Sequence, residues 1–240
     1  LVLCLNGTDL NKKYLNLIRV PFKLIYCDLP MNKARLFALK KIINKYTVII
    51  LIDSDDYMSN NRCEMIKKNL KKNDFIVNNL YTFSETYPKP KQWLKYSNRK
   101  KIKLNDIYSS NFIGLSNLTI RTASLKKIIN KINTDLVALD WCIAKLLLIY
   151  KFKGIFIKNI ITYYRQYKDN VSNLENFKKK QILKDLINKI EHYKFFKKFK
   201  IYNSKEISIL EIKLNEIKKI KKNDLKKIIN KKKINKTILR

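Results

Sequence analysis

Short apolar runs alternate along the chain with stretches in which apolar residues recur every three or four positions. Apolar runs bounded by turn-forming residues predict strands, and the spacing of three and four predicts helices. The predicted strands cover residues 1–5, 22–27, 47–52, 75–80 and 155–164, with a strand or turn at 112–120. The predicted helices cover residues 10–20, 31–46, 60–72, 121–132 and 140–150. Such alternation is typical of α/β layers.

The run TVIILI at 47–52 is rich in β-branched residues and has no polar side. A strand with this pattern is usually buried on both faces, as in a parallel sheet, so we expect it at the centre. The fold class that follows is α/β, with a mostly parallel central sheet, flanking helices and right-handed crossovers. The stretch 81–105 contains Pro88, Pro90 and Trp93 and is long enough to cover or form a site.

The character of the chain changes at about Gln166. Basic residues greatly outnumber acidic ones from there to the end, and Gly and Pro are absent. Apolar residues such as Ile207, Leu210 and Leu214 recur at helical spacing, which predicts basic amphipathic helices. Residues 207–214 also alternate as in a strand, so either structure is compatible with that segment.

Composition places the chain among globular proteins with a large excess of positive charge. Of its 240 residues 46% are hydrophobic, and the formal net charge is +34; this excludes disordered and collagen-like classes. The charge indicates either a compositional bias on solvated faces or an anionic partner. The four cysteines form no CxxC pair and His192 is the single histidine, so a zinc site has no support and a reducing compartment is expected. No apolar run approaches the roughly 20 residues of a membrane span.

Three carboxylates follow the predicted central strand directly, at Asp53, Asp55 and Asp56. Ligands of open α/β sheets bind beyond the carboxyl ends of the strands. Clustered carboxylates repel unless a cation neutralises them, and their oxygens suit Mg²⁺ or Mn²⁺, which bridge to substrate phosphates. The sequence therefore favours a metal–phosphate site over a simple helix cap. An EF-hand calcium loop needs a glycine at its sixth position, and this segment has none, so an EF-hand is excluded. A phosphatase-like nucleophile at Asp53 stays an alternative.

An ordered set of motifs resembles the core of a family 2 nucleotide-sugar glycosyltransferase, which has the glycosyltransferase-A fold. The set comprises NGTD at 6–9, NKAR at 32–35, TVIILIDSDDYM at 47–58, Arg62, ALDW at 138–141 and TYYRQYKDNV at 162–171. The resemblance implies a catalytic domain over residues 1–172 that lacks the family's first strand, as in an N-terminally truncated chain. Residues 173–240 would form a basic helical extension.

The resemblance also implies roles for individual residues. Asp140 would be the general base that deprotonates the acceptor hydroxyl, which gives inversion at the anomeric carbon; the alternative is a helix cap. Asp55 and Asp53 would hold Mn²⁺ or Mg²⁺ against the donor diphosphate. Arg35 would contact the nucleotide, and Asp53 would contact its ribose. Asp56 would help to position the metal ligands without binding the metal itself.

Three further positions complete the expected substrate site. Gly114 would lie near the acceptor, Trp141 would contact the sugar and Arg165 would bind phosphate. The alternative for Gly114 is a plain turn, and the alternative for Trp141 is a place in the core. Arg165 could instead pair with a carboxylate. Tyr167 replaces a histidine of the family's last motif, and Leu5-Asn6 replaces an acidic pair of its first.

The expected function is metal-assisted transfer of a sugar from a nucleotide-diphosphate donor to a glycan or lipid-linked acceptor. Such a role belongs to cell-envelope polysaccharide biosynthesis in the cytoplasm, with the basic helices resting on an anionic membrane surface. A basic protein that binds nucleic acid or a membrane surface without catalysis is the rival of a different class. Nucleic-acid binding is disfavoured because the aromatic residues do not interleave with the basic clusters.

Overall fold

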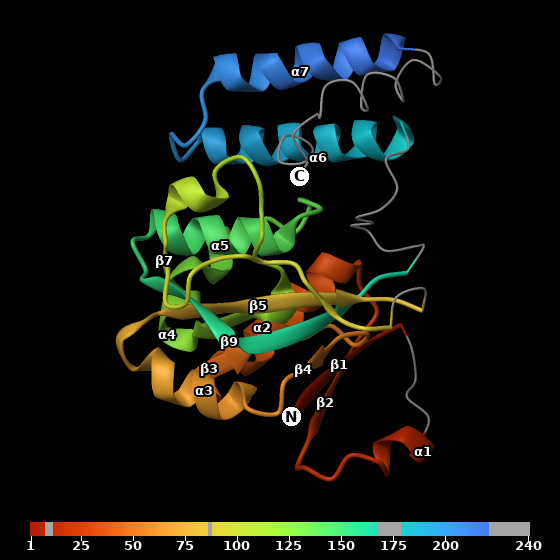
Figure 1. The fold of residues 1–240 in the computed structure, drawn as a ribbon, viewed down its shortest axis with the longest axis vertical. Helices are drawn as coiled ribbons and strands as arrows, with labels where there is room; N and C mark the ends of the chain where they lie inside the picture. The colour runs from red at the N-terminus through yellow and green to blue at the C-terminus, as the bar shows by residue number, and fades with distance from the viewer. Residues whose placement is uncertain (8–11, 86–87, 168–178, 221–240) are drawn as a thin grey trace.

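The computed structural model describes residues 1–7, 12–85, 88–167 and 179–220 (Figure 1). Its strands are β1 (Val2–Asn6), β2 (Lys23–Cys27), β3 (Val48–Ile50), β4 (Tyr57–Met58), β5 (Phe75–Phe83), β6 (Lys91–Gln92), β7 (Lys101–Ile102), β8 (Leu118–Arg121) and β9 (Gly154–Arg165). Its helices are α1 (Lys12–Leu15), α2 (Met31–Ile42), α3 (Arg62–Asn69), α4 (Thr122–Ile128), α5 (Leu139–Ile149), α6 (Lys179–Lys197) and α7 (Ser204–Lys219). The predicted alternation of strands and helices is present. The helix predicted for 10–20 is described from residue 12 and ends at Leu15, and the strand predicted for 112–120 is confined to β8.

The helices lie in layers on both sides of the main sheet. Helix α3 lies on one side, α5 on the other, and α6 and α7 follow farther out beyond α5 (Figure 1). A small core joins Ile66 of α3 to Ile76 and Ile160 of the sheet. A larger core joins the opposite face to α5 and α6. The chain therefore forms α/β layers, as predicted.

The main sheet is mixed, which corrects the prediction of a mostly parallel sheet. Its strands lie in the order β3-β8-β5-β9-β4, with β6 added to β5 and β7 to β9. Strands β5 and β9 are parallel, whereas β8 runs antiparallel to both β3 and β5, and β4, β6 and β7 also pair antiparallel. A hydrophobic pattern marks a strand but not its partner, because pairing joins residues far apart in sequence.

The strand predicted to be central lies at an edge of this sheet. Among the described strands β3 pairs with β8 alone. Its lack of a polar side has another cause: Ile49 packs into the larger core, and Val48 and Ile50 pack against the smaller one. Both faces of β3 are thus covered while one edge is open. Strand β5 takes the centre, and its first three residues, 75–77, are fully buried.

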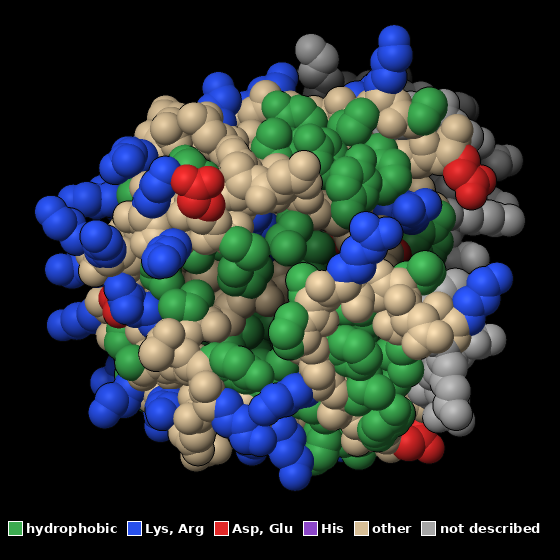
Figure 2. Space-filling model, turned by 90° about the horizontal axis from the view of Figure 1, so that it is seen from below, with side chains coloured by type: hydrophobic (Ala, Val, Ile, Leu, Met, Phe, Trp, Pro, Cys, Tyr) green, Lys and Arg blue, Asp and Glu red, His purple; other side chains and the backbone are tan. Residues whose placement is uncertain are grey.

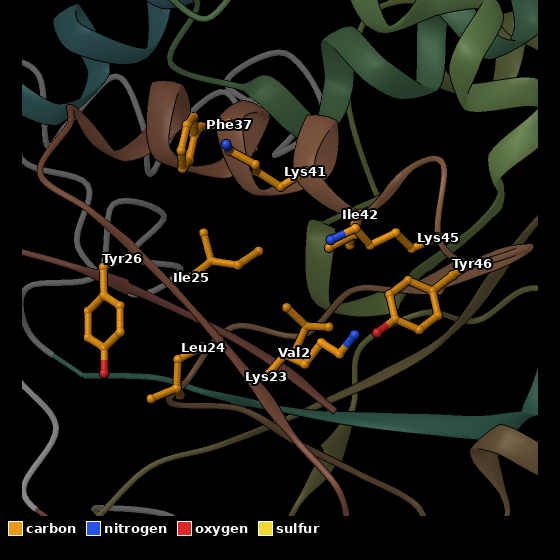
Figure 3. Close-up of a pocket in the computed structure, with 10 residues that line it drawn as sticks. All are labelled: Val2, Lys23, Leu24, Ile25, Tyr26, Phe37, Lys41, Ile42, Lys45 and Tyr46. Atoms are coloured by element: carbon orange, nitrogen blue, oxygen red, sulfur yellow. The ribbon is translucent and has the colours of Figure 1, made fainter.

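Strands β1 and β2 form a separate parallel sheet that joins no main-sheet strand in the described part of the chain. An open pocket of about 320 Å³ lies beside it, lined by Val2 of β1, residues 23–26 of β2 and side chains of α2 such as Phe37 (Figure 3). Two strands alone are marginally stable, so this unit depends on α2.

Positive charge dominates the surface. On the face seen in Figure 2, Lys and Arg side chains far outnumber Asp and Glu, and hydrophobic side chains lie exposed between them. Leu17 and Tyr26, on the first segments of the chain, are 70% and 59% exposed. No helix among the described residues is long and apolar enough to cross a membrane.

The region beyond Gln166 forms helices where it is described. Helix α7 includes residues 207–214, so the helical spacing and not the alternation decides that segment. Asn203 caps it by accepting a hydrogen bond from the Glu206 amide at 3.0 Å, and the Glu206 carboxylate accepts one from the Asn203 amide at 2.9 Å. This capping box satisfies two amides that the first turn leaves unpaired. Residues 168–178 and 221–240 of the predicted extension lie outside the described residues.

A fully buried lysine, Lys145 of α5, lies where α5 meets the C-terminal helices. Its Nζ lies 3.8 Å from the ring centroid of Trp141 and 4.4 Å from that of Tyr202. It donates hydrogen bonds to the Tyr108 carbonyl oxygen at 3.1 Å and to the Tyr202 hydroxyl. Burial without a carboxylate partner lowers the pKa of Lys145 to about 6, so the amine is neutral at pH 7.

We expect the Lys145→Met variant to be more stable than the wild type at pH 7. Between pH 6 and 10.5 the unfolded chain binds one proton more at this lysine than the folded chain. Wild-type stability therefore rises with pH, by at most about 1.4 kcal/mol per unit. Methionine fills the aromatic surroundings and removes this slope, which urea unfolding at pH 7, 8 and 9 measures. An equal slope in both proteins would contradict the assignment.

Candidate active site

Residues 53–56, which follow β3 and are called the acidic segment below, are held in a turn against the main sheet. The Asp56 amide donates to the Asp53 carbonyl oxygen at 3.1 Å, and the Asp53 amide donates to Ser116 Oγ at 2.9 Å. Arg35 Nη2 of α2 donates to Asp53 Oδ1 at 2.7 Å, and both side chains are about one-third exposed. An ion pair from a different element thus holds the first carboxylate at the surface.

Asp140 lies beside this pair, in the first turn of α5. Its Oδ1 accepts a hydrogen bond from the Trp141 amide at 2.6 Å. A Cβ atom added to Gly114 would lie 4.0 Å from Asp140 Oδ2, an ordinary contact distance, so Gly114 lies directly beside this oxygen. Burial raises the pKa of Asp140 to about 6; the field of Arg35 lowers it and that of Asp53 raises it further. The structure therefore brings the acidic segment, Arg35, Gly114 and Asp140 together.

Arg165, the last residue of β9, closes the other side of the acidic segment. Its amide donates to Asp56 Oδ1 at 3.0 Å and its Nε to the Asp55 carbonyl oxygen at 3.2 Å. Its guanidinium lies over the Phe83 ring, 5.0 Å from the centroid. Burial raises the pKa of Asp56 to about 6, although the nearby Ser116 hydroxyl and the Arg165 amide offset part of the rise. The buried Asp56 Oδ2 has no hydrogen-bond partner within the part of the chain that the structure describes.

The carboxylate of Asp55 makes no hydrogen bond or ion pair within the described part of the chain. The described residues contain no group of three or more acidic, histidine or cysteine side chains arranged to hold a metal. Mg²⁺ is commonly bound by one or two carboxylates together with substrate phosphates. The open Asp55 carboxylate and the unpaired Asp56 Oδ2 fit a metal of that kind, and they do not fit an all-protein metal cage.

A buried arginine, Arg62 at the start of α3, holds the segments of the site together. Its Nη1 donates to the Ser116 carbonyl oxygen at 2.7 Å and to Thr162 Oγ1 at 2.9 Å, and its Nη2 to the Leu51 carbonyl oxygen at 3.1 Å. The side chain is fully buried, and burial lowers its pKa to about 10. Arg62 belongs to the motif set, but the sequence assigns it no role.

Sequence reasoning missed the residues that follow Gly114. Ser116 binds the Asp53 amide, and Asn117 Oδ1 accepts from the Gly114 amide at 2.8 Å. Asn117 Nδ2 donates to the Asn78 carbonyl oxygen at 3.0 Å, which ties this turn to β5. Small polar residues after a glycine are ordinary turn residues, so only the fold reveals these contacts.

Trp141 does not lie where a sugar could stack on it. Its side chain is 5% exposed, and its Nε1 donates to the Ile107 carbonyl oxygen at 2.7 Å. We therefore place Trp141 in the core, which corrects its prediction as a substrate contact. Residues 8–9 of the NGTD motif and 168–171 of the last motif lie outside the described residues, and Tyr167 is half exposed.

Comparison with known proteins gives distant likenesses only. No protein-family model matches the sequence, and no curated protein matches it. The structure of S. aureus TarS 1–349 aligns over 64% of this chain and 46% of its own length, with 16% identity and a TM-score of 0.47. The structure of A197 from STIV aligns over 70% of this chain and 85% of its own length, with 13% identity and a TM-score of 0.40. The chain spans about half the length of TarS 1–349, and likenesses this low carry no argument about activity.

Replacing Arg62 by lysine is expected to destabilise the protein and open the site. Lysine lacks the planar fork that reaches three oxygens, and each buried acceptor left unpaired costs about 1–3 kcal/mol. Urea unfolding measures this loss. The exposed Arg19→Lys serves as the matched control and is expected to stay within about 0.5 kcal/mol of the wild type. Equal stabilities of the two variants would refute the role given to Arg62.

Proposed function

We propose that this protein is an inverting glycosyltransferase that moves a sugar from a nucleotide-diphosphate donor to a glycan or lipid-linked acceptor. The observation that carries the proposal is the position of Asp140 beside the Arg35–Asp53 pair. These residues come from motifs that lie far apart in sequence and that resemble family 2 glycosyltransferases. Their meeting at one place is what a shared donor site requires.

Asp140 is the proposed general base. A carboxylate accepts the proton of an acceptor hydroxyl when it lies within hydrogen-bond reach and is itself ionised. Burial brings its pKa to about 6, so the group is ionised at neutral pH yet more basic than an exposed carboxylate. The hydroxyl oxygen then attacks the anomeric carbon from the face opposite the diphosphate, which leaves with the bonding electron pair.

The donor is proposed to lie across the acidic segment. Arg35 and Asp53 face the nucleotide, and Arg165 and Asp56 close the opposite side. The acceptor is proposed to lie near Gly114, which is beside Asp140 Oδ2. A bound Mn²⁺ or Mg²⁺ would be held by Asp55, with Asp53 or Asp56, and would stabilise negative charge on the leaving diphosphate.

The other expectations keep the status of proposals. Cytoplasmic location, an anionic membrane surface and an envelope polysaccharide as product fit the basic surface, and none has a specific contact in its support. The phosphatase alternative needs a free nucleophile at Asp53, whereas Arg35 occupies its Oδ1 at 2.7 Å. Nucleic-acid binding rests on net charge alone.

Replacing Asp140 by asparagine is expected to lower kcat by about 10²–10⁴-fold, the usual contribution of a general base. In the wild type, kcat should rise with pH through about 6, because the base acts only when ionised. The variant should lose this limb. Initial rates of nucleoside diphosphate release with candidate sugar donors measure both effects. The exposed Asp135→Asn is the matched control and should keep the wild-type profile; an Asp140→Asn variant as active as this control would exclude the base.

Removal of the metal tests the acidic segment separately. Treatment with EDTA should abolish transfer, and Mn²⁺ or Mg²⁺ should restore it. The Asp55→Ala variant should need a much higher metal concentration for half-maximal rate, since the carboxylate is the one left open in the structure. Calorimetric titration of the nucleotide diphosphate with and without Mn²⁺ gives the same comparison for binding. Transfer that persists without divalent metal would contradict the metal role.

A further inference from the structure

The indole of Trp141 is held by the C-terminal helices. His192 of α6 stacks on it with ring centroids 4.0 Å apart and an angle of 12° between the planes. The Lys145 Nζ lies 3.8 Å from the centroid of the same ring, and the indole Nε1 donates to the Ile107 carbonyl oxygen. Trp141 is therefore fixed by residues of α5, of α6 and of the turn before residue 108.

The same layer extends to α7 through aromatic and polar contacts. Tyr193 of α6 stacks on Tyr202 with centroids 3.6 Å apart. The Tyr108 hydroxyl donates to Glu206 Oε1 of α7 at 2.5 Å, and to the Ile201 carbonyl oxygen at 3.0 Å. Helices α6 and α7 are thus joined to the layer that carries Asp140.

Asp140 is coupled to this layer through its neighbour. Its Oδ1 accepts from the Trp141 amide at 2.6 Å, so the position of the tryptophan backbone fixes the carboxylate. The charged groups that face the carboxylate are Arg35 of α2 and Asp53 of the acidic segment. Neither belongs to α6, so α6 acts on Asp140 by packing rather than by charge.

His192 is unusual for a side chain with a purely packing role. It is 1% exposed, and among the described residues neither ring nitrogen has a hydrogen-bond partner. Burial keeps its pKa far below the ordinary value, so the imidazole is neutral. Two buried nitrogens without partners destabilise the fold. What the imidazole contributes here is a flat ring on Trp141.

We propose that His192 is a positioning residue, and that the C-terminal helices fix the carboxylate of Asp140 through the His192–Trp141 stack. The inference rests on the proposed function for the meaning of Asp140, and it gives residues 179–220 a role in the reaction. The chain beyond the catalytic motifs is then part of the working site rather than an appendage.

The test compares two apolar replacements of His192. Phenylalanine keeps a flat ring on Trp141 and removes the unpaired nitrogens, so the His192→Phe variant should melt at or above the wild-type temperature and keep kcat within about twofold. Leucine fills space without a flat ring, so the His192→Leu variant should lose roughly tenfold or more in kcat, with the donor KM unchanged. The Ile182→Ala variant is the control for lost stability. It leaves a cavity beneath α6 ten positions from His192 without touching the stack, so it should keep kcat.

Hydrogen exchange of the Trp141 amide reads the same effect without any assay of transfer. Protection of this amide should fall in His192→Leu and stay at the wild-type level in His192→Phe and Ile182→Ala. Unchanged protection and kcat in His192→Leu overturn the inference. If no protein transfers sugar but protection still separates leucine from phenylalanine, the proposed function fails while the positioning of Asp140 stands.

Discussion

The site depends on one buried cation, the guanidinium of Arg62. It binds oxygens from the end of β3, from the turn after Gly114 and from β9. Taking an arginine out of water costs several kcal/mol, and charge-assisted hydrogen bonds to well-placed oxygens offset that cost. The acidic segment begins two residues after one of these oxygens, and Ser116 supplies both a carbonyl to Arg62 and a hydroxyl to Asp53. Arg62 therefore helps to fix the position of the acidic segment.

The sequence predicts most element types, because the apolar spacing of α2, α5 and β9 reflects the faces that these elements bury. It misplaces β3, since both faces of a strand can be covered while one edge is open. It misses the mixed sheet because β8 finds its partners far away in sequence. Ordered motifs predict the meeting of Arg35, Asp53 and Asp140. The local sequence does not show that Ser116 binds the Asp53 amide, nor that Trp141 lies in the core rather than against a sugar. Only their contacts in the folded protein show these roles.

The positive charge of the chain and the apolar side of its C-terminal helices have separate explanations. Most of the charge lies on exposed lysines, but Lys145 is carried into an aromatic core where its amine loses its proton at neutral pH. The amphipathic pattern that suggested a membrane surface is explained over 179–220 by packing on α5 and within the helix pair. The apolar side of these helices is thus used mainly for packing within the fold.

The central claim is that a nucleotide diphosphate and a divalent metal bind between the acidic segment and Asp140. A crystal structure of the protein grown with Mn²⁺ and a nucleoside diphosphate tests it most directly, because manganese gives an anomalous signal of its own. We expect an anomalous peak at about 2–2.2 Å from an oxygen of Asp55 and from the diphosphate, with the nucleotide beside the Arg35–Asp53 pair and Asp140. A nucleotide bound instead in the pocket beside β2, or metal bound away from Asp55, would contradict it.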